Sequence, residues 1–319
     1  MSATVPPIVD AHFHLYDPRA NRYGVFEHRD AIFEALVGDY AALPRTFLLD
    51  DYLQASAGWP VDGLIWHEFI SEDPESEVAW AERLAAASPL PMALVGLVDF
   101  ADRALEARLD AYRGHPHLTA VRQHLAWDAQ RPLRRMAARP DLLTDPAWRA
   151  GVALIEGSGL RCGLEVFAPQ LPDLLEVVRL HPGIDFTIAL MGWPTDLGPE
   201  AFVRWRSDIV ALGRCDNACA SISAVECIFG TDWSEDQLRP WILHVVESFG
   251  PYRCMLGSHL PISNLSYGFD TLYRAYDRIL AGCSGAERTA LFGATARDWF
   301  RVPRTGAVES EIPTSQVLQ

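Results

Sequence analysis

The amino-acid sequence predicts an α/β protein of the (β/α)8 TIM-barrel class. Short apolar segments rich in β-formers alternate with amphipathic helical segments along most of the chain, which is typical of parallel strands joined by crossover helices. Eight such strand segments can be recognised, and eight parallel strands close into a barrel. The chain has 319 residues, of which 49% are hydrophobic, and this is enough to bury one large core.

Each predicted strand is a short apolar run, and several runs are followed by a segment with one apolar helical face. The predicted strands are 8–14, 63–69, 93–100, 119–125, 162–167, 185–190, 218–224 and 255–259. The predicted helices include 76–87, 171–180, 201–212, 238–249 and 286–292. Glycine and proline mark the joins, as at Pro182 and Gly183.

Residues 1–302 are expected to form a single barrel domain. The stretch 17–59 contains no predicted strand, so we expect it to form a loop with helices over the barrel mouth. The tail 303–319 contains two prolines and a polar run, which predicts an extended C-terminal arm that is disordered on its own and, if ordered, is docked on another subunit.

The composition limits the classes of partner and of chemistry. A net charge of -15 disfavours nucleic acid and anionic membranes, and no apolar run is long enough to span a membrane. The sequence contains no lysine, so Schiff-base chemistry and a carboxylated lysine bridge are excluded. Six cysteines without a CxxC pair indicate reduced thiols in a cytoplasmic protein. A small molecule or another protein is the expected partner.

The strongest functional signal is the pair His12 and His14 at the end of the first predicted strand. Strand side chains alternate between faces, so residues two apart point the same way and two imidazoles can close on one metal ion. The alternative is a pair of partly exposed histidines that serve only as hydrogen-bonding groups. The apolar run before the pair buries the strand and favours the metal site.

Further metal-capable side chains end other predicted strands, where barrel enzymes place their active sites. Closure makes the first and eighth strands neighbours, so His259 can join His12 and His14 as a third nitrogen ligand. Glu165, at the end of the fifth strand, could add an oxygen ligand, bridge a second metal ion or act as a base. The other side chains in equivalent positions are His67, Glu68, Asp99 and His124.

Alternatives stay open for these side chains. His67 lies on the opposite face of its strand from Trp66 and Glu68, and the pattern alone does not say which face meets the site. His124 can be a catalytic base, a substrate contact or a hydrogen-bonded buried imidazole. Asp99 and Glu68 can be salt-bridge partners of Arg122 or helix caps.

Beyond these patterns, the chain resembles the amidohydrolase-related family, in the branch that holds bacterial sugar-lactone and pyrone-dicarboxylate lactonases. The likeness covers nearly the whole chain and implies an amidohydrolase-type barrel with its site at the carboxyl ends of the strands. The residues that carry it are Val9-Asp10-Ala11-His12-Phe13-His14-Leu15-Tyr16-Asp17, 121–123, 166–172, 249–258, 261–265 and 291–296.

The chain also departs from the pattern of this family. Ala189 and Leu190 stand where the family usually has an Asp-His pair, and Glu165 stands where a neutral glutamine is common. His259 replaces the strand-eight aspartate that deprotonates water, and a histidine that binds metal has no lone pair left to act as a base. The substitutions therefore favour metal binding over proton abstraction.

Three functions are compatible with this site. The first is a non-haem hydroxylase or monooxygenase acting on a small organic acid, with iron or manganese, because imidazoles and one carboxylate leave positions for dioxygen and substrate. A few amidohydrolase-related proteins similar in fold work in this way, including the two-subunit 2-aminoisobutyrate hydroxylase. The chain would then be the catalytic subunit, or a supporting subunit with a mononuclear zinc site.

The second function is hydrolysis of a lactone or similar cyclic ester by zinc-activated water, with Glu165 or His124 as base. The third is a catalytically degenerate scaffold subunit. We expect a homo-oligomer or a hetero-oligomer with a related barrel subunit. Trp66 and Trp193 could form walls around a substrate, and Arg122 could pair with its carboxylate or with Asp99 or Glu68 instead. The sequence does not name the substrate.

Overall fold

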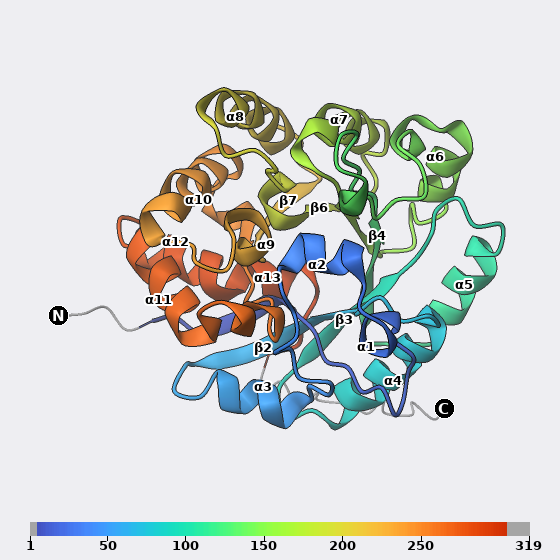
Figure 1. Ribbon diagram of the computed structural model, residues 1–319, viewed down its shortest axis with the longest axis horizontal. Coiled ribbons are helices and arrows are strands. Elements are labelled where there is room, and N and C mark those ends of the chain that lie inside the picture. Colours follow the sequence, from blue (N-terminus) through green and yellow to red (C-terminus); the bar gives the residue numbers. More distant parts are fainter. Residues whose placement is uncertain (1–4, 305–319) are drawn as a thin grey trace, which may run out of the picture.

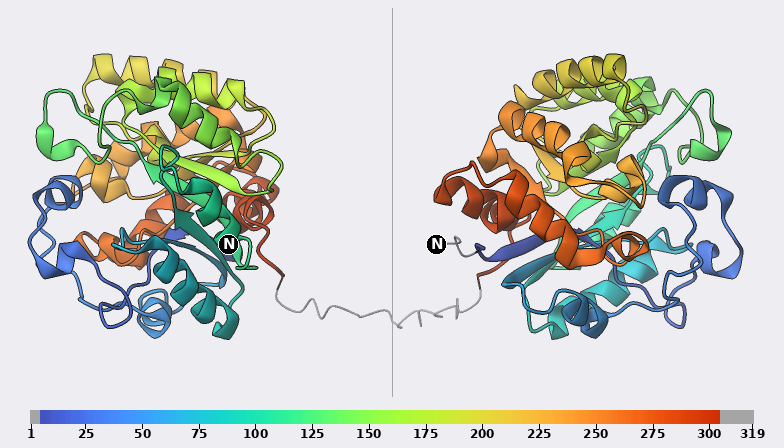
Figure 2. Two further views of the ribbon diagram at one scale, coloured as in Figure 1. Left: turned by 90° about the vertical axis from the view of Figure 1, so that its right-hand side faces the viewer. Right: turned by 60° about the vertical axis from the view of Figure 1, so that its left-hand side comes forward.

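The computed structural model describes residues 5–304, and their strands form one parallel sheet in sequential order. Figure 1 shows the strands inside a ring of helices, and the two views of Figure 2 show the same outer layer. The fold is thus the α/β barrel that the alternating pattern predicts. The strands are β1 Ile8–Phe13, β2 Val61–His67, β3 Met92–Leu97, β4 Leu118–His124, β5 Arg161–Glu165, β6 Phe186–Ile188, β7 Ala218–Ile222 and β8 Cys254–Leu256.

The helices cover the outer face of these strands. Three of the predicted helices are longer than expected, and the segment 286–292 continues from a short α-helix into a π-helical turn, Ala290–Ala294. The helices are α1 Gly24–Glu27, α2 Ala31–Val37, α3 Leu49–Ala55, α4 Pro74–Ala87, α5 Leu105–Tyr112, α6 Pro146–Ala153, α7 Leu171–Leu180, α8 Pro199–Gly213, α9 Val225–Phe229, α10 Glu235–Phe249, α11 Gly268–Ile279, α12 Gly285–Thr289 and α13 Thr295–Trp299.

Side chains alternate between the inside and the outside of the barrel. On β2, Ile65 belongs to a small buried cluster with Val95 and Ala120, whereas Leu64 and Trp66 join the larger apolar core under the helices. Phe300 belongs to the same small cluster as Ile65. The segment after α13 therefore packs against the inner side chains of the strands.

Hydrogen bonds beyond the ends of β1 and β8 bring the first and last strands together. The His259 amide donates to the His12 carbonyl at 2.7 Å, and the His14 amide donates to the Leu260 carbonyl at 2.8 Å. The Asp10 carboxylate accepts from the Ser258 amide at 2.8 Å. This pairing places His259 beside His12 and His14.

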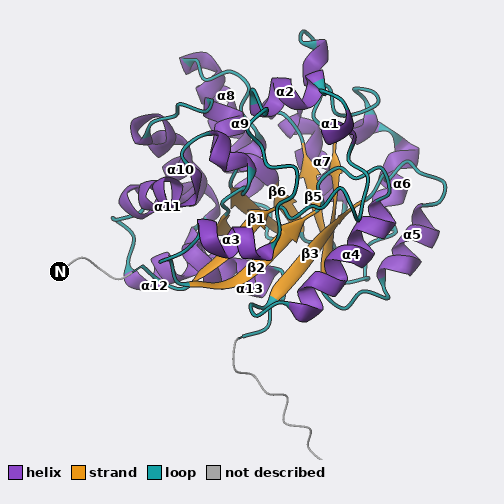
Figure 3. Ribbon diagram, turned by 60° about the horizontal axis from the view of Figure 1, so that its bottom comes forward, coloured by secondary structure: helices purple, strands orange, loops and turns teal. Residues whose placement is uncertain are grey.

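The insertion 17–59 carries α1, α2 and α3. Figure 3 shows α1 and α2 beyond one end of the strands, and side chains of α2 line a cavity there. The Asp30 carboxylate caps α2 by accepting from the amides of Ile32 and Phe33. Most of the predicted arm, 305–319, lies outside the described residues. Within residues 5–304, no helix is long and apolar enough to cross a membrane.

Candidate metal centre

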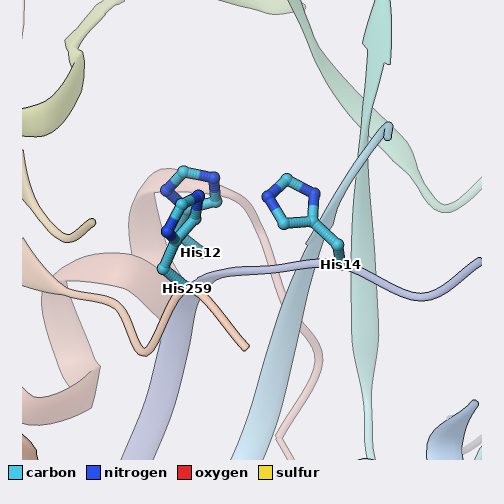
Figure 4. Close-up of side chains that lie close together, drawn as sticks. All are labelled: His12, His14 and His259. Carbon is cyan, nitrogen blue, oxygen red and sulfur yellow. The ribbon is translucent and has the colours of Figure 1, made fainter. Parts of the chain in front are cut away.

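Three histidines converge in a cavity at the carboxyl ends of the strands. One ring nitrogen from each of His12, His14 and His259 lies within 4.8 Å of the others, and all three side chains are buried. Figure 4 shows the three rings close together, two from β1 and its extension and one from the segment after β8. The grouping expected from the sequence is therefore present in the structure.

The second nitrogen of each ring is held by a different hydrogen-bond partner. His12 Nδ1 lies 2.8 Å from Ser223 Oγ, and His259 Nδ1 bonds to the Glu226 carboxylate. His14 Nδ1 lies 3.0 Å from the His67 carbonyl and 3.1 Å from the Glu68 carbonyl. Because carbonyls and carboxylates only accept, Nδ1 carries a proton in His14 and His259, and Nε2 is the nitrogen of each of these rings that can bind a metal ion.

His12 Nε2 is buried and has no hydrogen-bond partner among the described residues. Burial, together with the neighbouring histidines and Arg122, holds the pKa of His12 and His14 well below its usual range. These imidazoles are therefore neutral at pH 7. Neutral imidazoles with free nitrogens, each oriented by a hydrogen bond on its far side, fit a divalent metal ion such as zinc.

A second group of metal-capable side chains overlaps the first. Glu226, Cys227 and His259 also lie with one ligand atom each within 4.8 Å of one another. Because Glu226 bonds to His259 Nδ1, we assign it as the group that orients His259 and not as a ligand.

Backbone strain is concentrated around the cavity. Six of the seven non-glycine residues with positive φ follow the ends of β2, β6, β7 and β8. Such conformations cost of order 1–3 kcal/mol each, so the surrounding structure must hold them in place. These residues are Ile70, Leu190, Met191, Trp193, Ala224 and His259.

An ion-pair network forms another part of the cavity wall. The Arg122 guanidinium donates to Glu68 Oε1 and to Glu165 Oε1, both at 2.6 Å, and to the Glu68 carbonyl at 2.8 Å. His124 bonds to Glu165 Oε2 at 2.6 Å and to Glu68 Oε1 at 2.9 Å. All four side chains lie beside the cavity, so two cations and two carboxylates balance there.

This network corrects the roles expected for Glu165. Both of its carboxylate oxygens are engaged by Arg122 and His124, and Glu165 does not belong to the groups that could hold a metal ion among the described residues. Burial alone would raise the pKa of Glu165, but the charges of Arg122 and His124 outweigh burial and hold it below its usual range. Glu165 is thus placed neither as a ligand nor as an effective base.

His124 is likewise not placed as a base. Burial would lower its pKa, but the carboxylates of Glu165 and Glu68 outweigh burial and raise the pKa to about 9. His124 is therefore protonated at neutral pH. The hydrogen bonds to Glu68 and Glu165 explain why: they stabilise the cationic form of the ring.

The three side chains expected to contact a substrate lie in different environments. Trp193 lines the cavity. Trp66 is on the outer face of β2, where its indole N–H donates to the Leu15 carbonyl, so the expected contact with substrate is corrected. Arg122 lines the cavity, but all three of its guanidinium nitrogens are engaged, and it pairs with Glu68 and not with Asp99.

His67 and Asp99 also have defined positions. The His67 ring lies inside the barrel, 4.2 Å from the ring of His12, and its Nε2 bonds to the Ala11 carbonyl at 3.1 Å. Asp99 is exposed and accepts from the Gln123 amide group and the Ala101 backbone. Neither residue belongs to the three-histidine group.

Sequence reasoning missed the residues that orient the histidines and the apolar cavity wall from α2. Ser223 and Glu226 follow the end of β7, the position at which barrel enzymes collect functional groups, so their location was an available signal. Nothing in the pattern indicated which histidine each would face.

Two relatives match much of this chain in sequence, and one solved structure matches it in fold. The uncharacterised protein y4mH of Sinorhizobium fredii is 27% identical over 92% of this chain and 98% of its own length. The L-fucono-1,5-lactonase of Burkholderia multivorans is 26% identical over 71% of this chain and 77% of its own length. The crystal structure of an amidohydrolase from Burkholderia multivorans with bound zinc matches with a TM-score of 0.76 at 23% identity, over 93% of this chain and 100% of that chain.

The family model described as amidohydrolase matches residues 9–302, which include the three histidines and the whole barrel. Because the match covers nearly the full sequence, the chain belongs to the amidohydrolase family.

Proposed function

We propose that this chain is a metal-dependent hydrolase that opens a lactone or a similar cyclic ester. The observation that carries the proposal is the convergence of three buried imidazoles at the base of the cavity, with the far nitrogen of each ring held by a hydrogen bond. We assign His12, His14 and His259 as the ligands of one zinc ion. When bound there, zinc would keep a fourth position at which it lowers the pKa of water to about 7 and polarises a carbonyl.

The residues of the chain then have separate tasks. Ser223 and Glu226 orient His12 and His259, so that their lone pairs face the ligand position. His124 is held as a cation by Glu68 and Glu165. It would give a proton to a departing alkoxide by exchanging its longer hydrogen bond, 2.9 Å to Glu68, for one to the substrate. Arg122 fixes both carboxylates and so positions His124.

The comparisons support hydrolysis more than oxidation. The lactonase among the relatives opens a cyclic ester by its name, and a related barrel was crystallised with zinc. A shared fold does not by itself select a reaction, so the assignment rests mainly on the histidines of this chain.

A second candidate function is the iron- or manganese-dependent hydroxylation expected from the sequence. It is favoured by one observation: the two carboxylates that line the cavity among the described residues, Glu68 and Glu165, are both engaged by Arg122 and His124. Among the relatives named above, the lactonase is the one whose name states a specific reaction. As part of this second candidate function, we propose that the chain forms an oligomer with a related barrel subunit.

The test is a lactone-hydrolysis assay on the full chain loaded with zinc or with iron. We expect zinc-dependent ring opening, loss of about 10²–10⁴ in kcat/KM for His124→Gln if it is the general acid, and no change for the exposed His28→Gln. Iron-dependent consumption of dioxygen without lactone hydrolysis would contradict the proposal and favour the second candidate.

A further inference from the structure

Apart from the histidines and the ion-pair network, the wall of the cavity is apolar. Helix α2 contributes three side chains, and the segments after β2, β4, β6 and β8 contribute the others. Cavities lined in this way hold ligands mainly by burying apolar surface. The apolar side chains that line it are Phe33, Leu36, Val37, Phe69, Ile70, Met136, Leu190, Trp193 and Ile262.

The cations of the cavity wall are already neutralised. Arg122 and His124 are the positively charged side chains among the described residues that line the cavity. Each of them bonds to both Glu68 and Glu165, and every guanidinium and ring nitrogen is used. A carboxylate or phosphate on a substrate would therefore meet no unpaired cationic side chain in this wall.

The position of the histidines decides which part of a substrate faces which wall. If a carbonyl faces the three imidazoles at the base, the rest of the molecule extends along the apolar side chains of α2 and the loops. A charged group on that distal part would lose its hydration without gaining a partner, which is costly. A hydrocarbon group would instead gain contact with the wall.

We propose that the substrate is an uncharged ester or lactone whose body is a hydrocarbon group, and not an organic acid. This inference rests on the proposed hydrolytic function for the identity of the reacting group. It differs from the small organic acid that the sequence alone led us to expect, because the structure pairs Arg122 with Glu68 and Glu165.

The test compares two δ-lactones of equal chain length, one with a pentyl side chain and one whose side chain ends in a carboxylate. Their lactam analogues, which resist hydrolysis, are titrated by calorimetry into metal-free and zinc-loaded protein. We expect the neutral lactam to bind at least about tenfold more tightly in both forms, because the carboxylate stays unpaired. Equal or tighter binding of the carboxylated lactam, or failure of both to bind, would overturn the inference.

Hydrolysis of the two lactones separates this inference from the proposed function. If zinc-loaded protein hydrolyses neither lactone, hydrolysis is contradicted, while the order of lactam affinities still decides the substrate class. If it hydrolyses the carboxylated lactone faster than the neutral one, hydrolysis stands and the inference fails.

A matched pair of variants tests the role of the wall itself. Met136 lines the cavity and is half-buried, whereas Leu133 lies in the same loop with 54% of its surface exposed. Met136→Arg places a cation beside the distal part of the ligand, so the preference for the neutral lactam should fall about tenfold. Leu133→Arg should leave it unchanged. An unaltered preference in Met136→Arg would contradict the proposed orientation.

Discussion

His124 keeps its charge inside the barrel because two carboxylates face its two ring nitrogens. The same two carboxylates hold Arg122, so the network is balanced only when His124 is protonated. A buried network of this kind positions its members rigidly, and loss of one charge leaves the others uncompensated. The folded protein should therefore respond to the titration of this one residue.

The pH dependence of stability tests this residue directly. The pKa of His124 is raised to about 9 in the folded protein from 6.5. Its contribution is therefore fully present below pH 6.5 and is lost as the pH rises through 9. The difference in unfolding free energy between wild type and His124→Gln should shrink by about 3 kcal/mol between about pH 6 and pH 10, measured by urea denaturation.

The control for this experiment is Arg274→Gln, which removes an exposed ion pair with Asp270. Its effect on the unfolding free energy should stay below about 1 kcal/mol and should not follow the His124 profile. A His124→Gln difference that is constant with pH, or that grows as the pH rises, would show that His124 is not a buried cation.

The three metal-capable histidines could be predicted from the sequence for a simple geometric reason. His12 and His14 share a strand face, and closure of the barrel brings the eighth strand beside the first. The role of Glu165 could not be predicted, because it depends on the direction in which Arg122 extends across the barrel. The acceptors Ser223 and Glu226 were missed because the turn after β7 positions them.

At the scale of elements, β1 and β8 approach each other closely because Gly257 has no side chain. A Cβ atom on Gly257 would lie 2.7 Å from the Cβ of His12 and 3.0 Å from that of Ser223. The Gly257 amide also donates to the Ile222 carbonyl at 3.0 Å, so the segment has little room to move away. Close packing here keeps His12 and His259 within reach of one another.

Gly257→Ala should therefore separate the two strands and displace His12. We expect the unfolding free energy to fall by about 1–3 kcal/mol through overpacking, with a weaker affinity for zinc measured by competition with a chelator. Gly282→Ala is the matched control, because no atom lies within 4 Å of its added Cβ. An unchanged zinc affinity in Gly257→Ala would show that this contact does not position the site.

The positions of the strands could be predicted better than their ends. The predicted strand 185–190 is in fact β6, Phe186–Ile188, because the chain turns through Leu190 and Met191 with positive φ. No propensity favours such a turn at Leu or Met, so this early end of the strand could not be predicted. Helix α2 was also not located, since a helix of seven residues offers too few turns for a clear periodic pattern.

At the scale of the whole molecule, the chain returns after its last helix to pack against the inside of the barrel. Phe300 is 1% exposed, its ring centroid lies 6.4 Å from that of His67, and it borders a small cavity beneath the histidines. The inner side chains around it are small, including Ala120 and Gly163, so Phe300 fills much of the available space.

Phe300→Ala should leave a cavity at this point and lower the unfolding free energy by about 3–5 kcal/mol, measured by thermal or urea denaturation. Tyr252→Ala, which removes an aromatic side chain that is 64% exposed, should change it by less than about 0.5 kcal/mol. Equal effects of the two substitutions would mean that the segment after α13 does not contribute to the barrel core.

The assembly of the molecule and its cytoplasmic location stay predictions from the sequence. The oligomer with a related barrel subunit was expected mainly from the tail 303–319, most of which lies outside the described residues. Six free cysteines in the structure are compatible with reduced thiols. The barrel itself could be predicted because its alternating pattern extends over the entire chain.

The central claim is that one divalent metal ion is held by His12, His14 and His259. The most direct measurement is the zinc content of protein dialysed after saturation with zinc, determined by elemental analysis for wild type and for each single alanine variant. We expect about one zinc per chain in wild type and in the control His28→Ala, and almost none in His12→Ala, His14→Ala or His259→Ala. A wild type without bound metal, or a His259→Ala variant that retains its zinc, would contradict the account.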